Sequence, residues 1–471
     1  ADPLTYVFHI RKGVHWHNKA PMNGREFIAD DAVFNFHRML GMGSGFTEPS
    51  TGIGELGKPQ WESITATDKY TVVFKLKQPY LRAVNVITDW YSMVIYPPEV
   101  IKEHGNMQDW KNLVGTGPFI LTDYVEGSSL SYVKNPDYWG YDEKYPKNRL
   151  PYIDELKWRI MPEEATFLAA LRAGQVDYVG WAGTSQVRSI DLIEQLKKTS
   201  PELLIWPFSE GNENVFTPNV SKPPFDDIRV RHALQMALDL ETFNNSYFKG
   251  YGDTTPMGMT SVKGFYIPFE EWPQEVKNAY TYDPEGAEKL LDEAGYPRGS
   301  DGIRFKFALM RTPAQSDLSF DQLVGAYWRK IGVDMEIEVI DRPKAVTALR
   351  ERNFEMGGTR AAGVADPILS VGIFASESPW NPVASNDPGY NALYEKALAA
   401  GTYEEQTQTL IEMDMHVIKK HWIIWGPDTP LFHVTPPWLK GYNGEAGMGA
   451  LKFPIFARLW IDQDLKKEMG F

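Results

Sequence analysis

The sequence predicts an α/β protein of two or three structural units, in which helices connect the strands of a sheet. The first observation is the length, because 471 residues exceed what one core usually supports, and at about 150 residues per domain the expectation is about three units. The second is the composition, since 43% apolar, 13% aromatic and 23% charged residues are typical of a folded globular protein. The third is a regular alternation of strand and helix patterns from about residue 282 onwards.

Short strands and isolated helices are predicted over the first half of the chain. In the first helix Ala32, Val33 and Phe36 recur at helical spacing, and the second helix is followed by Gly174, where a helix C-cap belongs. The predicted strands cover residues 6–10, 71–76, 120–124 and 130–134, and the predicted helices cover residues 30–40 and 165–173.

Residues 219–239 have the order of a turn, a helix cap and a buried helix face. Pro223 and Pro224 break any preceding strand, and Asp226 or Asp227 can cap the helix that follows. The apolar stripe of this helix consists of Val230, Ala233, Leu234, Ala237 and Leu238.

The last part of the chain predicts an α/β layer with crossover helices. Asp283 and Pro284 mark a helix start, and Gly295 marks the end of that helix. Further strands are predicted at 304–310 and 333–339, a strand-like run at 354–360, and further helices at 318–331, 343–352, 389–399 and 403–420.

Charge and cysteine content exclude several classes of function. A net charge of -14, from 62 acidic and 48 basic residues, argues against a nucleic-acid partner, which usually meets a basic face. The absence of cysteine excludes disulfides, thiolate metal sites and cysteine nucleophiles.

Catalytic and metal motifs are weak, so we expect no enzyme, no metal and no cofactor. The common signatures of serine hydrolases, zinc proteases and P-loop proteins are missing. His15 and His17 would share a strand face and could be two ligands of zinc or nickel, but two ligands are too few, which favours a solvated strand face.

Aromatic residues are the more suggestive excess, with 15 Trp and 23 Tyr. Such rings serve both cores and ligand pockets. Trp181, Trp380 and Trp425 lie at or next to predicted loops or strand ends, where a cleft would be lined, although each is also compatible with a core position.

Seven segments, in order, resemble family 5 of the extracellular solute-binding proteins, which includes the oligopeptide- and dipeptide-binding receptors of ABC importers. Each alone is also a capped helix or a tight turn, and their order makes the resemblance specific. The segments are residues 6–16, 29–38, 115–119, 133–140, 167–177, 219–239 and 287–296.

The resemblance implies a two-lobed periplasmic-binding-protein-like fold, type II, in the large cluster C form with an extra subdomain. Lobe 1 would comprise residues 115–210 plus 438–471, with the extra subdomain at 1–114, and lobe 2 would comprise residues 211–437. Its final segment, 441–471, would then contact residues near 116–210. In the family several tens of residues precede the segment that matches Tyr6, so we expect an N-terminally truncated chain of a periplasmic or extracytoplasmic protein, with a lipid anchor in the missing segment as one option.

The resemblance also implies a ligand site. In peptide-binding members an aspartate pairs with the peptide α-amine, within a motif that matches here at Arg360 and Asp366 and departs at Gly363, where the family often has tryptophan. Asn381 matches a second pocket-facing motif, in which Asn391 replaces the usual aspartate.

The function expected from the resemblance is a monomeric, non-catalytic receptor that captures short peptides between two lobes and delivers them to the permease of an ABC transporter. Asp366 would meet the ligand ammonium and Arg360 a carboxylate, because buried ligand charges need opposite charges. Family members also carry oligosaccharides, nickel complexes, opines and haem. The alternatives are an oligosaccharide receptor of this family, or a carbohydrate-active enzyme with an aromatic cleft and two converging carboxylates.

Overall fold

The protein divides into two compact units joined by two strands. The computed structural model describes residues 2, 4–49, 61–81, 83–88, 94–180, 187–208, 214–259, 263–312, 318–358, 367–445 and 455–471. Unit 1 consists of residues 1–206 and 432–471, and unit 2 of residues 207–431. The chain passes from one unit to the other within β7 (Leu204–Phe208) and β13 (Leu431–Thr435), which pair with each other. The additional subdomain at residues 1–114 stays a prediction.

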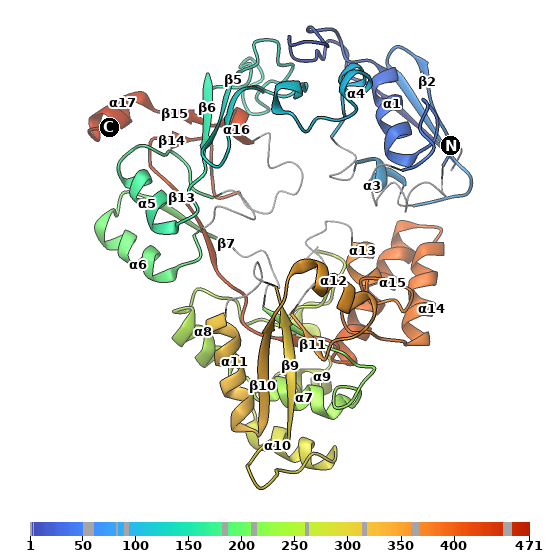
Figure 1. Ribbon diagram of the computed structural model, residues 1–471, viewed down its shortest axis with the longest axis vertical. Helices are drawn as coiled ribbons and strands as arrows, with labels where there is room; N and C mark the ends of the chain where they lie inside the picture. Colours follow the sequence, from blue (N-terminus) through green and yellow to red (C-terminus); the bar gives the residue numbers. More distant parts are fainter. Residues whose placement is uncertain are drawn as a thin grey trace. The chain divides into compact units, whose positions relative to one another are not determined.

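Unit 1 contains three small antiparallel sheets among short helices (Figure 1). Their strand orders are β1-β3-β2, β4-β5-β6 and β14-β15. The strands are β1 (Thr5–His9), β2 (Trp61–Asp68), β3 (Thr71–Leu76), β4 (Phe119–Val125), β5 (Ser129–Lys134), β6 (Glu155–Arg159), β14 (Leu439–Lys440) and β15 (Trp460–Ile461). The helices are α1 (Ala29–Leu40), α3 (Ala83–Thr88), α4 (Pro98–His104), the 3-10 turn η2 (Trp110–Asn112), α5 (Glu164–Arg172), α6 (Ile190–Thr199), α16 (Ile455–Arg458) and α17 (Gln463–Glu468).

Helix α1 covers one face of the first sheet, as its apolar spacing predicted. Ala32, Val33 and Phe36 are buried in one cluster with Trp61 and Phe74 of the sheet. The Phe36 and Phe74 rings meet edge to face with their centroids 5.0 Å apart. Such aromatic contacts add stability beyond the apolar area that they bury.

The end of the chain returns to the middle of unit 1. The Trp438 indole donates a hydrogen bond to Asp177 at 2.7 Å, and the Lys466 ammonium pairs with the same carboxylate at 2.8 Å. The Tyr152 amide bonds to the Ala457 carbonyl at 3.0 Å. The contact expected between residues 441–471 and residues near 116–210 is therefore present.

Unit 2 is built on a five-stranded sheet with the order β10-β9-β11-β8-β12 (Figure 1). β9, β10 and β11 run parallel, and β8 is antiparallel to both of its neighbours. The strands are β8 (Val215–Pro218), β9 (Phe305–Arg311), β10 (Val333–Val339), β11 (Met356–Gly357) and β12 (Ile424–Trp425). The helices are α7 (Ile228–Met236), α8 (Leu240–Tyr247), the 3-10 turn η3 (Phe269–Glu271), α9 (Gln274–Asn278), α10 (Pro284–Glu293), α11 (Leu318–Lys330), α12 (Arg342–Arg350), α13 (Pro367–Gly372), α14 (Pro388–Ala399) and α15 (Tyr403–Lys419). Among the helices described, none has both the length and the hydropathy needed to cross a bilayer.

Two helices of unit 2 begin at the caps that the sequence predicts. Asp227 is the cap of α7, accepting a hydrogen bond from the Arg229 amide at 2.8 Å, which decides between Asp226 and Asp227. Asp283 accepts from the Gly286 amide at 2.9 Å at the start of α10, and Gly295 after that helix has a φ of 90°. A side-chain oxygen at such a position satisfies an otherwise unpaired first-turn amide.

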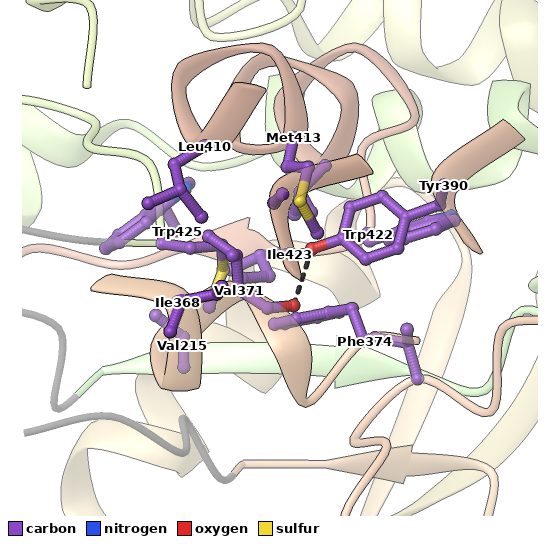
Figure 2. Close-up of a cluster of buried hydrophobic side chains, with 14 residues drawn as sticks. Val215, Ile368, Val371, Phe374, Tyr390, Leu410, Met413, Trp422, Ile423 and Trp425 are labelled. Atoms are coloured by element: carbon purple, nitrogen blue, oxygen red, sulfur yellow. Dashed lines mark hydrogen bonds between the residues drawn. The ribbon is translucent and has the colours of Figure 1, made fainter. Parts of the chain in front are cut away.

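A large apolar cluster packs α13, α14 and α15 together (Figure 2). Phe374 and Trp422 stack with ring centroids 6.0 Å apart, and Val215 and Trp425 belong to the same cluster. The Tyr390 hydroxyl in this cluster donates to the Val371 carbonyl at 2.6 Å, as the dashed line in Figure 2 shows. Unpaired polar groups are costly in such surroundings, so this bond satisfies both atoms.

His421, at the end of α15, is buried without a hydrogen bond to either ring nitrogen. Its ring lies 4.9 Å from the His232 ring and 5.0 Å from the Tyr280 ring, and the Arg231 guanidinium donates to its carbonyl. Burial, together with the nearby His232 and Arg231, lowers the pKa of His421 well below its usual value of 6.5. The imidazole is therefore neutral in the folded state.

Acid should weaken unit 2 through His421. Below pH 6.5 the unfolded chain takes up a proton on this residue and the folded chain does not, so stability is lost by up to about 1.4 kcal/mol per pH unit as the pH falls. We expect His421→Leu to lose less unfolding free energy than the unsubstituted protein between pH 6.5 and 5.5. Urea denaturation at both pH values measures this difference, and equal losses in the two proteins would contradict it.

Candidate functional site

The segment predicted to bind ligand, residues 359–366, belongs to unit 2 and starts just after the carboxyl edge of its parallel strands. Arg360, Gly363 and Asp366 lie outside the described residues, as does Trp181. The residues at both ends of the segment are described: Gly358 follows β11 and Pro367 opens α13. In the register of the sheet, the ends of β9, β10 and β11 lie at one edge. Loops at this edge of an α/β sheet are where ligands usually bind.

The first end of the segment is held by a buried ion pair. Arg311, the last residue of β9, forms a two-pronged pair with Asp321 of α11, and the two side chains are only 3% and 1% exposed. The third contact of the guanidinium is a hydrogen bond from Nη1 to the Gly358 carbonyl at 2.9 Å. Bidentate pairs of this kind fix geometry as well as supplying energy.

Gly358 is required by this arrangement. A Cβ atom at this position would overlap the Arg311 guanidinium. At the neighbouring Gly357, a Cβ atom would lie 2.9 Å from the Thr217 hydroxyl of β8. A larger residue at Gly358 would therefore displace the guanidinium, and one at Gly357 would require the Thr217 side chain to move.

The second end of the segment is held by the apolar cluster. Ile368 and Val371 of α13 are buried in that cluster, and the Tyr390 hydroxyl bonds the Val371 carbonyl (Figure 2). The eight residues 359–366 therefore connect a strand end and a helix that are both fixed by buried contacts.

The buried Asn381 side chain bonds the backbone of its own loop. Its amide group donates to the carbonyls of Phe374, Ala375 and Ser385, and its oxygen accepts from two backbone amides of the loop. The Val220 amide bonds to Val383 of this loop, beyond the amino end of β11. The expected contact of Asn381 with a ligand stays a prediction.

The two described tryptophans of the predicted site are in different surroundings. Trp425 is 5% exposed, lies in the same apolar cluster as Ile368, and exchanges two backbone hydrogen bonds with the Gln235 side chain. Trp380 is 44% exposed, and the Arg350 guanidinium lies 5.1 Å from its ring centroid. The described residues do not bring these two rings together, and their role in ligand binding stays a prediction.

His15 and His17 were expected to lie on a solvated strand face. This expectation is wrong, because the two side chains do not form such a face. His17 is buried, accepts a hydrogen bond from the Gly115 amide at Nδ1 and bonds the Gly117 carbonyl through Nε2. Burial lowers the pKa of His17, which keeps the ring neutral. His15 bonds the Gly24 carbonyl through Nδ1. Over the part of the chain that the structure describes, no three or more acidic or histidine side chains gather as metal ligands would.

Arg311, Asp321 and Gly358 were not among the residues predicted from the sequence. Arg311 ends a predicted strand and Asp321 lies within a predicted helix, and neither position has a local signal of pairing. The adjacent glycines 357 and 358 within a strand-like run were the available signal, because such glycines often mark the close approach of another group.

Two compact units joined by a pair of strands, with a five-stranded mixed sheet in the second unit, are typical of bacterial solute-binding receptors. The chain belongs to the bacterial extracellular solute-binding proteins, family 5, whose middle-region model matches residues 1–382. The resemblance noted from the sequence is thereby confirmed.

Two relatives show how far this likeness extends. Heme-binding protein A of Haemophilus influenzae is 28% identical over 459 residues, covering 94% of this chain and 79% of that protein. The dipeptide-binding protein of Escherichia coli is 30% identical over 351 residues, covering 71% of this chain and 60% of that protein.

Solved structures show the same fold. DppA of Helicobacter pylori, in complex with the peptide STSA, has a TM-score of 0.72 at 24% identity, covering 98% of this chain and 87% of that one. The protein AppA from Clostridium difficile has a TM-score of 0.79 at 20% identity, covering 98% of this chain and 90% of that one. The predicted α/β fold of the periplasmic-binding type is confirmed.

Replacing Gly358 should disrupt the buried ion pair. We expect Gly358→Ala to lower the unfolding free energy by about 2–4 kcal/mol, because the new methyl group displaces the Arg311 guanidinium from its partners. Gly401→Ala is the matched control, since a Cβ atom there would lie 3.6 Å from the nearest atom, in ordinary contact. Denaturant unfolding measures both, and a Gly358→Ala protein as stable as the control would refute the steric argument.

Proposed function

We propose that this protein is an extracytoplasmic receptor that binds short peptides at the segment 359–366 of unit 2 and delivers them to the permease of an ABC transporter. In this proposal it acts as a monomer and binds its ligand without converting it. The observation that carries the proposal concerns the surroundings of this segment. It contains Arg360 and Asp366, it starts after Gly358 at the carboxyl edge of the parallel strands, and the described residues on both sides of it make buried contacts.

The names of relatives support a peptide as the ligand. One relative is named a dipeptide-binding protein, and one structure of the same fold holds the peptide STSA. Another structure of the fold is a dipeptide-binding protein from Pseudoalteromonas in complex with Met-Leu. A further relative is named for heme, so heme is the competing ligand to test.

Charge pairing accounts for the choice of Asp366. A peptide ammonium loses its hydration on binding, which costs several kcal/mol unless an anion and hydrogen bonds replace the water. Asp366 would supply that anion. Arg360 would offer the planar donors that suit a peptide carboxylate. Gly363, in place of the family's frequent tryptophan, would leave room for a ligand side chain.

Peptide binding and the role of Asp366 can be tested together. We expect Met-Leu or STSA to bind in isothermal titration calorimetry, and Asp366→Asn to weaken the binding by about 2–5 kcal/mol, since a buried ammonium loses its partner. N-acetyl-Met-Leu, which lacks the ammonium, should bind the unsubstituted protein weakly and lose little more from the substitution. Asp283→Asn, at the cap of α10, removes the same charge elsewhere in unit 2 and should leave the affinity unchanged.

The same titrations separate the alternatives. Heat from cellotriose or maltotriose without heat from peptides would favour an oligosaccharide receptor, and tight binding of hemin alone would favour a heme receptor. Equal affinity of Met-Leu for the Asp366→Asn protein and the unsubstituted protein would refute the role of Asp366, even if peptides bind.

A further inference from the structure

We propose that the buried Arg311–Asp321 pair is a positioning device for the ligand-binding segment, and that neither residue contacts the ligand. The inference deepens the proposed function and rests on it, because the segment in question is the one that holds Asp366.

The pair connects three elements at one point. Arg311 ends β9, Asp321 lies in α11, and the carbonyl that the guanidinium binds belongs to Gly358, directly after β11. β11 is only two residues long and has few ladder hydrogen bonds of its own. A fixed donor beyond its last residue therefore determines where the following segment starts.

Stability alone gives little reason for a charged pair at this place. Replacing a buried ion pair by apolar side chains of similar volume is often neutral or stabilising, because two charges no longer have to leave water. Apolar side chains, however, offer no donor to the Gly358 carbonyl. What the pair supplies, and apolar residues cannot, is a hydrogen bond of defined direction to the strand end.

The guanidinium is also unavailable to a ligand. Its Nε and Nη2 atoms bond Asp321, its Nη1 atom bonds Gly358, and its central carbon lies 5.2 Å from the centroid of the Phe216 ring. The side chain is 3% exposed, and Asp321 already neutralises its charge. Arg311 therefore acts on the ligand through the backbone at Gly358.

The other end of β9 provides a matched comparison. Arg304, immediately before β9, is also buried, pairs with Glu288 and Asp292, and bonds the Ile331 carbonyl at 2.9 Å. It has the same chemistry on the same strand, at the edge opposite to Gly358. Substitution of Arg304 should change stability without changing the start of the segment.

The experiment compares the double variant Arg311→Met/Asp321→Leu with Arg304→Met. Two quantities are measured: amide hydrogen exchange over residues 354–358 of the free protein, and the affinity for Met-Leu and STSA by calorimetry. Thermal unfolding is recorded for each protein, so that a variant with a lowered melting temperature is compared at the same distance below its own transition.

We expect the double variant to exchange its amides at 354–358 at least roughly tenfold faster, and to bind the peptides at least roughly tenfold more weakly, as the loss of a hydrogen bond from a charged donor implies. Arg304→Met should leave both quantities unchanged. A double variant with unaltered exchange overturns the positioning role, and so does one that exchanges faster but binds Met-Leu as before.

Failure of the proposed function would look different. If the unsubstituted protein binds neither peptide, the peptide function fails, and the exchange rates still decide whether the pair holds the strand end. Loss of folding in the double variant would show that the pair serves stability. The same two measurements on the single variant Asp321→Asn would then test whether the pair also positions the strand end. Exchange in Asp321→Asn equal to that of the unsubstituted protein would overturn the proposal.

Discussion

Buried backbone groups must find hydrogen-bond partners, and unit 2 meets this constraint with buried side chains between elements distant in sequence. Asn219 bonds the carbonyls of Arg352 and Phe354 ahead of β11, Gln235 pairs with the backbone of β12, and Arg311 bonds the carbonyl after β11. The short central strands of the sheet have few ladder bonds of their own, so their positions depend on these contacts.

The fold was predictable because local signals agreed along much of the chain. Caps such as Asp227 and Asp283, the glycine after α10 and the apolar spacing of α1 each appear in the structure where the sequence places them. A cap or a periodic face needs only neighbouring residues, so the sequence contains the information in full. The parallel strands β9 and β10 followed from the same alternation of patterns.

The candidate site was less predictable, because its parts interact across long distances. The Arg311 guanidinium donates to the carbonyl of a residue 47 positions away. The spacing of apolar residues along the chain does not indicate such a contact. An exposed indole and a buried one also have the same local signature, which is why Trp380 and Trp425 could not be distinguished from sequence. His17 is a third example, since the glycines whose backbone groups bond its ring are about 100 positions away.

The return of the C-terminal segment to unit 1 has a consequence for how the chain matures. Unit 2 is continuous in sequence, whereas unit 1 needs Trp438 and Lys466 to complete its contacts with Asp177. During synthesis, domains generally fold as units as the chain emerges. The inserted unit can therefore fold while the earlier part of unit 1 still lacks Phe456 and Leu459, the apolar side chains of the last segment that pack against it.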